Sequence, residues 1–121
     1  MKLSLLPETL AVSRLTALEP WVLECPGFLS VTRTAEEVSV VCLESRVPPG
    51  TRAELGFRAL KVEGPLDFSL TGILANLSGA LASAKISLFA LSTFDTDYLL
   101  VRQISLEAAM AALRRVGHQI E

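Results

Sequence analysis

A short polar segment between two apolar runs constrains this chain more than any other feature. The apolar residues 86–91 precede the segment and residues 98–102 follow it, so the two runs are predicted to form strands joined by a turn. The segment itself, STFDTD at residues 92–97, contains three hydroxyls, two carboxylates and one aromatic ring. These are more hydrogen-bonding groups than a plain turn requires. Polar groups placed in this way can hold a small zwitterion.

Length and charge restrict the class of protein. The chain has 121 residues, half of them hydrophobic, which fits one ordinary domain or two very small ones that share a core. A net charge of -2 argues against nucleic acid, which requires clustered cations. The longest apolar runs fall short of the roughly 20 residues that cross a bilayer. Pro7 and Glu8 interrupt the first leucines before a signal peptide could form. We therefore expect a cytoplasmic protein with no nucleic-acid or membrane partner.

Residues that commonly carry catalysis or bind metals are sparse. Cys25 and Cys42 are too far apart in sequence for a C-x-x-C motif, and we interpret both as buried thiols that behave as small hydrophobic side chains. The single histidine, His118, lacks partners at metal-binding spacing and is expected to be an ordinary strand residue. We therefore expect no enzymatic activity, no metal site and no cofactor.

The first half of the chain is predicted to contain strands and little helix. Three strands are expected, at residues 8–15, 27–33 and 38–43. Pro20 and Pro26 limit any intervening helix to one turn around residues 21–24. The sequence RVPPG at residues 46–50 is the strongest break in the chain. We place the boundary between the halves near it, with one unit at residues 1–54 and the other at residues 55–121.

The second half has the order strand, helix, strand, strand, helix, strand. The strands are expected at residues 56–63, 86–91, 98–102 and 118–121. The helices are indicated by apolar stripes at Leu70, Ile73, Leu74, Leu77 and Leu81, and at Leu106, Met110, Leu113 and Val116. Ser105 is the expected N-cap of the second helix and Gly117 its stop. Two right-handed crossovers place both helices on one face of an antiparallel sheet, which is a ferredoxin-like α+β arrangement.

A weak internal repeat supports a chain of two parts. Residues 32–41 align with residues 92–101, and in both segments a hydroxyl residue ends one strand and an acid begins the next. The first half has no room for a helix as long as those of the second. We therefore interpret it as a shortened copy.

Two longer segments resemble a known family. The run GFRALKVEGPLDFSLTGILANL at residues 56–77 and the run ISLFALSTFDTDYLLV at residues 86–101 resemble ACT domains. The similarity is greatest to small tandem ACT-like proteins of bacteria, related to aspartokinase regulatory domains and to cytosolic arginine sensors. It implies two ferredoxin-like βαββαβ units in tandem, the N-terminal one shortened. It also implies that a free amino acid binds between ACT units and that the protein forms a homodimer.

The expected site combines the start of the first long helix with the 92–97 turn, because both can lie at one end of the sheet. Free N–H groups near the helix start suit a carboxylate, and nearby acids suit an α-ammonium group. An acid directed at the far end of the ligand would favour a cationic side chain. The candidate ligand-binding residues are Glu63, Asp67, Phe68, Thr71, Ser92, Thr93, Phe94, Asp95 and Asp97.

Structural alternatives exist for these residues. Asp95 and Asp97 can simply cap the turn, Phe94 can be a core residue, and Glu63 can be a solvated strand end. The protein as a whole can be an assembly module, in which the ACT scaffold pairs subunits and the ligand site is vestigial. An enzyme would be indicated only if His118 lay within hydrogen-bond reach of Ser92 or Thr93.

Overall fold

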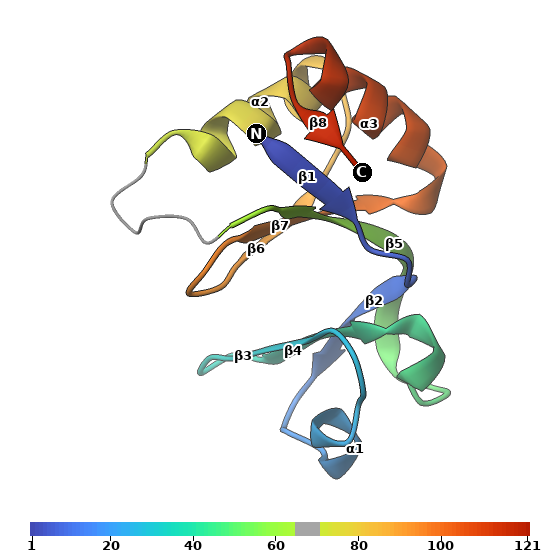
Figure 1. The fold of residues 1–121 in the computed structure, drawn as a ribbon. Coiled ribbons are helices and arrows are strands. Elements are labelled where there is room, and N and C mark those ends of the chain that lie inside the picture. The colour runs from blue at the N-terminus through green and yellow to red at the C-terminus, as the bar shows by residue number, and fades with distance from the viewer. Residues whose placement is uncertain (65–70) are drawn as a thin grey trace. The chain divides into compact units, whose positions relative to one another are not determined.

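The structure, a computed structural model, describes residues 1–64 and 71–121 (Figure 1). The strands are β1 (Lys2–Leu5), β2 (Leu10–Leu15), β3 (Leu29–Arg33), β4 (Val38–Leu43), β5 (Arg52–Val62), β6 (Phe89–Ser92), β7 (Asp97–Arg102) and β8 (Gln119–Ile120). The helices are α1 (Pro20–Leu23), α2 (Ile73–Ser83) and α3 (Leu106–Arg115), with 3-10 turns at Glu44–Arg46 and Gln103–Ser105. The chain forms an N-terminal unit, Glu8–Phe57, and a C-terminal unit, Met1–Pro7 with Arg58–Glu121.

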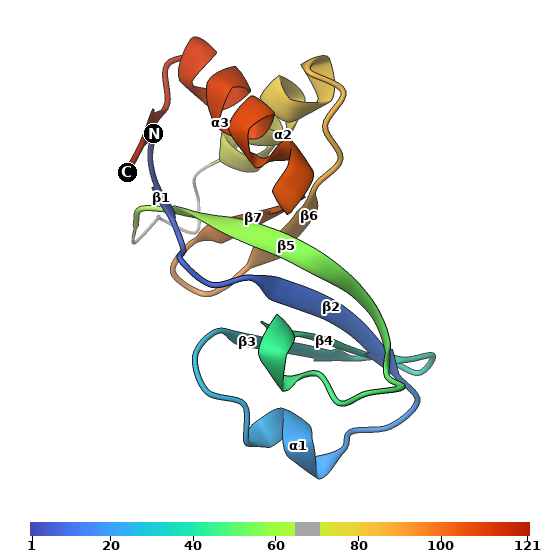
Figure 2. The same ribbon diagram turned by 90° about the vertical axis from the view of Figure 1, so that its right-hand side faces the viewer.

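The C-terminal unit has the predicted ferredoxin-like arrangement. Its elements follow one another as β5, α2, β6, β7, α3 and β8, and its strands lie in the order β8-β1-β5-β7-β6. Both helices cover the same face of this sheet (Figure 2). Their apolar residues and those of the strands form one core, with Leu60 and Val62 from β5, Leu77 and Leu81 from α2, and Ala109 and Leu113 from α3.

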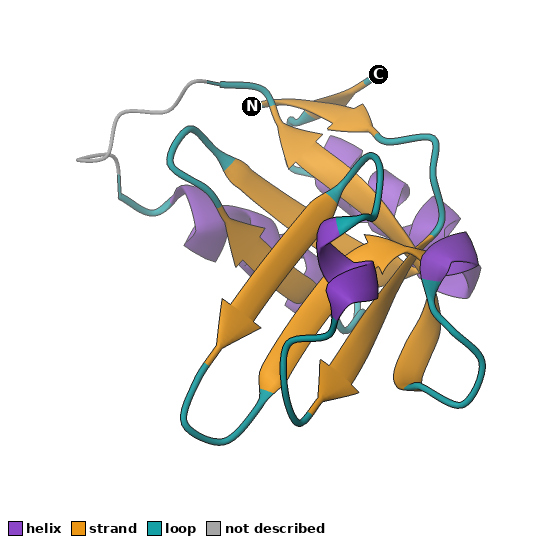
Figure 3. Cartoon of the chain, turned by 90° about the horizontal axis from the view of Figure 1, so that it is seen from below, coloured by secondary structure: helices purple, strands orange, loops and turns teal. Residues whose placement is uncertain are grey.

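One strand of this sheet was not expected from the sequence. β1 lies between β5 and β8, antiparallel to β5 and parallel to β8, so it adds a parallel pair to an otherwise antiparallel arrangement. The alternation of polar and apolar residues in Lys2–Leu5 is the strand signal that explains it, and Leu3 is fully buried. The N- and C-terminal residues consequently lie side by side (Figures 1 and 3), where Lys2 Nζ and Glu121 Oε2 form an ion pair at 3.2 Å.

The N-terminal unit is a shortened version of the same order. Its elements follow as β2, α1, β3, β4 and the first part of β5, and its strands lie in the order β3-β4-β2-β5. The helix α1 is a single turn, as predicted, and begins at Pro20, one residue before the predicted segment. A 3-10 turn, Glu44–Arg46, stands at the position that α3 occupies in the C-terminal unit. The strand β5 therefore ends one ferredoxin-like unit and begins the other.

An extra residue in β5 separates these two roles. Leu10 pairs with Phe57 and Val12 pairs with Glu54, so the register between β2 and β5 shifts by one residue. Such a β-bulge interrupts the regular hydrogen-bond ladder. Here the freed N–H group of Gly56 donates to Glu44 Oε1 at 2.7 Å. The bulge is thus fixed by a side chain of the same unit.

The two hairpins confirm the internal repeat but correct its register. In the β3–β4 hairpin, Thr34 N donates to Glu37 O at 2.9 Å; in the β6–β7 hairpin, Thr93 N donates to Thr96 O at 2.8 Å. Thr34 therefore corresponds to Thr93, one position away from the alignment made on sequence. Side chains alternate between the two faces along a strand. An alignment that is wrong by one residue therefore matches side chains that point to opposite faces of the sheet.

Two predicted details of the C-terminal unit were wrong, and a third, the N-cap of α3, was confirmed in position only. The strand predicted at residues 86–91 begins only at Phe89, and Ile86 joins the core from the connection before it. Val116 lies beyond the end of α3 and is 55% exposed, so it does not extend the buried stripe. Ser105 occupies the N-cap position of α3, but its side chain makes no capping hydrogen bond.

The start of α2 also differs from the prediction. Gly72 was expected inside the helix, whereas it is the N-cap residue and has a φ of 82°. A left-handed backbone at this position favours glycine because it has no Cβ. Leu70, the first residue of the predicted apolar stripe, lies outside the described residues.

The two glycines of this region provide a test of that backbone requirement. A Cβ added at Gly72 or at Gly79 would meet no atom within 4 Å, so the two positions differ in backbone conformation rather than in space. Gly72→Ala is expected to lower the free energy of unfolding by about 1 kcal/mol. Gly79→Ala, inside α2, is expected to raise it by up to about 1 kcal/mol. Urea denaturation of both variants measures the difference, and equal shifts would contradict the assignment of Gly72 as the N-cap.

Candidate functional site

The hydroxyls of the 92–97 turn are used largely within the turn. Ser92 pairs with Asp97 across the hairpin, and Ser92 Oγ donates to Asp97 Oδ1 at 2.5 Å. Thr93 Oγ1 accepts a hydrogen bond from Thr96 N at 3.2 Å. Asp97 therefore helps to close the turn, which was one of the structural alternatives. Its second carboxylate oxygen remains a potential acceptor, because a carboxylate accepts several hydrogen bonds.

A residue that the sequence prediction did not select attaches this turn to the sheet. Thr96 is 5% exposed, and its Oγ1 donates a hydrogen bond to the carbonyl oxygen of Val62. Val62 is the last residue of β5, and Glu63 follows it. The turn and Glu63 therefore lie at the same end of the C-terminal sheet. The sequence alone does not distinguish Thr96 from Thr93, because both are threonines in the same turn. The hydrogen bond to Val62 on β5 distinguishes Thr96.

Glu63 is held in place by β1. Its N–H group donates to Lys2 O at 2.8 Å, and its Oε1 accepts a hydrogen bond from Ser4 Oγ. The residue is half-buried. Glu63 is thus more constrained than the solvated strand end considered as an alternative. The sequence prediction missed Ser4 because it assigned no strand to residues 2–5.

The remaining predicted residues are exposed or lie outside the described part of the chain. Phe94 is 80% exposed, so the alternative of a core residue is wrong. Exposure is also found for four predicted polar residues, Thr71, Ser92, Thr93 and Asp95. Asp67 and Phe68 fall outside the described residues, and their predicted convergence with the turn therefore stays a prediction.

The start of α2 lies at this same end of the sheet. In a strand–helix–strand crossover, the helix begins at the end where its preceding strand finishes, and Figure 1 shows the first turn of α2 and the β6–β7 turn at the same end of the unit. Among the described residues, no side chain caps α2, and its first turn contains no acidic residue. The N–H groups of this turn and the positive end of the helix dipole therefore favour a negatively charged group.

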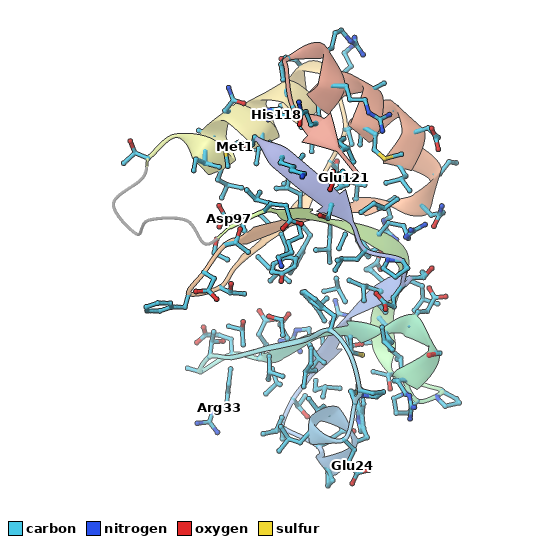
Figure 4. The ribbon with its side chains drawn as sticks, in the orientation of Figure 1. Met1, Glu24, Arg33, Asp97, His118 and Glu121 are labelled. Atoms are coloured by element: carbon cyan, nitrogen blue, oxygen red, sulfur yellow. The ribbon has the colours of Figure 1, made fainter. Side chains whose placement is uncertain are left out.

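His118 lies apart from this site. It is buried, and its Nε2 is 2.8 Å from Asn76 Oδ1 on α2. Figure 4 shows His118 close to Met1 and well separated from Asp97. Burial, together with the positive charge of the Met1 amino group, lowers the pKa of His118. A catalytic role would have been indicated by a hydrogen bond between His118 and Ser92 or Thr93. The ring nitrogen of His118 contacts Asn76 instead.

A groove of about 350 Å³ lies elsewhere in the C-terminal unit, between α2 and α3. Small residues form much of its lining, which comprises Asn76, Gly79, Ala80, Ser83, Ala84, Ala112, Arg115 and Val116. None of the described candidate residues lines it. Within residues 1–64 and 71–121, no group of three or more His, Cys, Asp and Glu is arranged to hold a metal ion. The helices of the described chain are all too short or too polar to cross a membrane.

Family models match both parts of the chain. Residues 52–115 match the ACT domain, and residues 8–50 match an N-terminal domain model. The first match spans more than half of the chain, which therefore belongs to the ACT domain family. This membership supports a regulatory, ligand-binding role. No curated protein sequence matches the chain.

Solved structures share the fold over nearly the whole chain. A protein from Agobacterium tumefaciens is 37% identical, with a TM-score of 0.91, and the match covers 99% of this chain and 91% of that one. A protein from Vibrio cholerae is 17% identical, with a TM-score of 0.79 and coverage of 94% and 88%. The regulatory subunit of aspartate kinase from Thermus thermophilus is 12% identical, with a TM-score of 0.64 and coverage of 91% and 93%. The last two similarities concern the fold alone.

The attachment of the turn by Thr96 can be tested by removing one hydroxyl. Thr96→Val is expected to lower the free energy of unfolding by about 1–2 kcal/mol, because the Val62 carbonyl loses its partner in a buried environment. Thr32→Val, on the exposed strand β3, is the matched control and is expected to change stability by less than about 0.5 kcal/mol. Thermal unfolding measures both, and equal effects would contradict the role assigned to Thr96.

The environment of His118 predicts a dependence of stability on pH. Its folded-state pKa lies below the ordinary value of 6.5, so below about pH 6.5 the unfolded chain binds a proton that the folded chain resists. The wild-type protein is therefore expected to lose stability relative to His118→Gln as the pH falls through this range, and to keep a constant difference above it. Chemical denaturation from about pH 5 to about pH 8 measures this. Parallel curves throughout would contradict the lowered pKa.

Proposed function

We propose that this protein is a regulatory module that binds a free amino acid at the end of the C-terminal sheet where α2 begins. The observation that carries the proposal is the position of two half-buried carboxylates, Glu63 and Asp97, at that end of the sheet. Each carboxylate accepts a hydrogen bond from a serine of the C-terminal unit, Glu63 from Ser4 and Asp97 from Ser92. Membership of the ACT domain family supports the choice of an amino acid.

The two charged groups of an amino acid have separate binding groups in this proposal. The ligand carboxylate lies against the first turn of α2, which no side chain of the described residues caps, next to Thr71. The ammonium group lies against Glu63 and Asp97, since a buried cation requires paired acceptors. The sequence-based candidates Asp67 and Phe68 belong to the proposed site by their place in the chain. Ser92 and Thr93 support the turn and contribute hydroxyl oxygens at its surface.

The turn itself determines which side chain is preferred. Phe94 presents an exposed aromatic ring, and Asp95 an exposed carboxylate. An aromatic face and a carboxylate both attract cations. We therefore propose that a cationic side chain, such as that of arginine or lysine, is accommodated better than an anionic one. The protein acts in this proposal as a cytoplasmic homodimer without catalytic activity.

Calorimetric titration of the intact chain with each of the twenty amino acids tests the proposal. A binding amino acid is also expected to raise the melting temperature with its concentration, because it stabilises only the folded state. At 100 times the dissociation constant, this stabilisation is about 2.7 kcal/mol. The absence of a response to all twenty amino acids would contradict the proposal.

Two charge-neutral variants test the assigned ammonium partners. Glu63→Gln and Asp97→Asn each keep the acceptor oxygen that the neighbouring serine uses, and each removes the negative charge. Each is expected to weaken binding of the responding amino acid about tenfold or more, as for loss of a charged hydrogen bond. Glu8→Gln, an exposed acid of the N-terminal unit, is the matched control. Equal affinities of all three variants would place the amino acid elsewhere.

The alternative function is assembly alone, with the ACT scaffold pairing subunits and a vestigial site. It has a different experimental signature. Sedimentation of the chain would then give a dimer whose dissociation constant does not respond to any of the twenty amino acids. A dimer that tightens or loosens with one of them supports the regulatory function instead.

A further inference from the structure

The two cysteines of the N-terminal unit lie against each other. Cys25 follows α1, and Cys42 is the second-last residue of β4. Seventeen positions separate the two cysteines in sequence. Both belong to one apolar cluster with Val22, Val38 and Val40. The Cys25 thiol lies close enough to Cys42 to contribute to the raised pKa of the Cys42 thiol. Both cysteines therefore pack among apolar side chains, as the sequence interpretation expected, although Cys25 is only partly buried.

The backbone around the cysteines brings them together independently of the thiols. Gly27 lies two residues after Cys25, and a Cβ built at Gly27 would lie 3.5 Å from Leu43 Cδ1, next to Cys42. The chain then continues into β3, whose first residue, Leu29, pairs directly with Cys42. The segment before β3 is thus packed against the end of β4 by contacts that involve neither sulfur.

The two sulfurs differ in accessibility. Cys25 is half-buried, and its Sγ donates to Trp21 O at 3.4 Å. Cys42 is fully buried. Burial, and then the neighbouring Cys25 thiol, raise the pKa of Cys42 from 9.0 to about 11. Cys42 therefore stays a neutral thiol at physiological pH, and an oxidant from solution reaches Cys25 first.

We infer that Cys25 and Cys42 form a redox-active dithiol that hydrogen peroxide converts into an intramolecular disulfide. Peroxide transfers one oxygen to the Cys25 sulfur, which gives a sulfenic acid and one molecule of water. The Cys42 sulfur then attacks the Cys25 sulfur. The S–S bond forms, the S–O bond breaks, and the hydroxyl group leaves with the Cys42 proton as a second water molecule. Two thiols and one peroxide thus give one disulfide and two waters.

The product would attach the end of α1 covalently to the central strand of the N-terminal unit. The reduced unit relies for this contact on a four-residue helix and a small apolar cluster. A cross-link that closes this loop restricts the unfolded chain. The oxidised protein is therefore expected to melt at a higher temperature than the reduced protein. Dithiothreitol is expected to reverse the change.

Intact-mass spectrometry of the folded full-length chain after limited peroxide treatment tests the inference. The wild-type chain is expected to lose two hydrogen atoms, to give a Cys25–Cys42 cross-linked peptide in a non-reducing digest, and to remain unlabelled by dimedone, which traps sulfenic acids. Cys42→Ala is expected to gain oxygen at Cys25 and to be labelled by dimedone. Cys25→Ala is expected to keep its single thiol, because Cys42 is buried.

Three outcomes would overturn the inference. The wild-type chain could gain oxygen as Cys42→Ala does, it could form disulfides only between chains, or it could retain both thiols until it is unfolded in urea. Circular dichroism of each variant before treatment establishes that it is folded. The mass of the wild-type product decides the question even where a variant fails to fold.

Discussion

Strand β5 is paired along its length, and the register of that pairing is the constraint on which the other elements depend. Its first part pairs with β2 in the N-terminal unit, and its second part pairs with β1 and β7 in the C-terminal unit. A slip of one residue would turn Leu60 and Val62 out of the core. The bulge at Gly56 separates the two pairings. Each unit can therefore keep its own register although they share one strand.

At the C-terminal end of β5, side-chain hydrogen bonds fix the chain in place. Ser4 of β1 donates a hydrogen bond to the Glu63 side chain, and Thr96 of the β6–β7 turn donates one to the Val62 carbonyl. Two neighbouring residues are therefore each fixed by a hydroxyl from another part of the C-terminal unit. Side chains supported by a second layer of hydrogen bonds keep a defined geometry without a ligand. The two carboxylates proposed as ligand groups are thus held at strand ends by hydrogen bonds, whereas Phe94 at the tip of the turn is exposed.

Periodicity and turn chemistry predicted most elements, because those signals are local. The strand at Val38–Leu43 and the single helical turn at α1 were found with almost correct limits. The strand at Lys2–Leu5 was missed because its alternation covers only four residues and both of its partners, β5 and β8, are distant in sequence. The start of α2 was misplaced because no pattern in the sequence specifies a positive φ at Gly72. For the site, composition identified the polar turn, but the role of Thr96 depends on a carbonyl that only the tertiary structure brings near.

The insertion of β1 makes the C-terminal unit discontinuous in sequence. Leu3 pairs with Ile120, and the N-terminal unit, Glu8–Phe57, separates β1 in sequence from the part of the C-terminal unit that begins at Arg58. During synthesis, β1 leaves the ribosome among the first residues and β8 among the last. β1 therefore cannot form its pairing with β8 until the end of this sequence has been made. Contacts so distant along the chain slow folding. The strands of the N-terminal unit are close in sequence. That unit can therefore form before β8, the last strand of the C-terminal unit, has been synthesised.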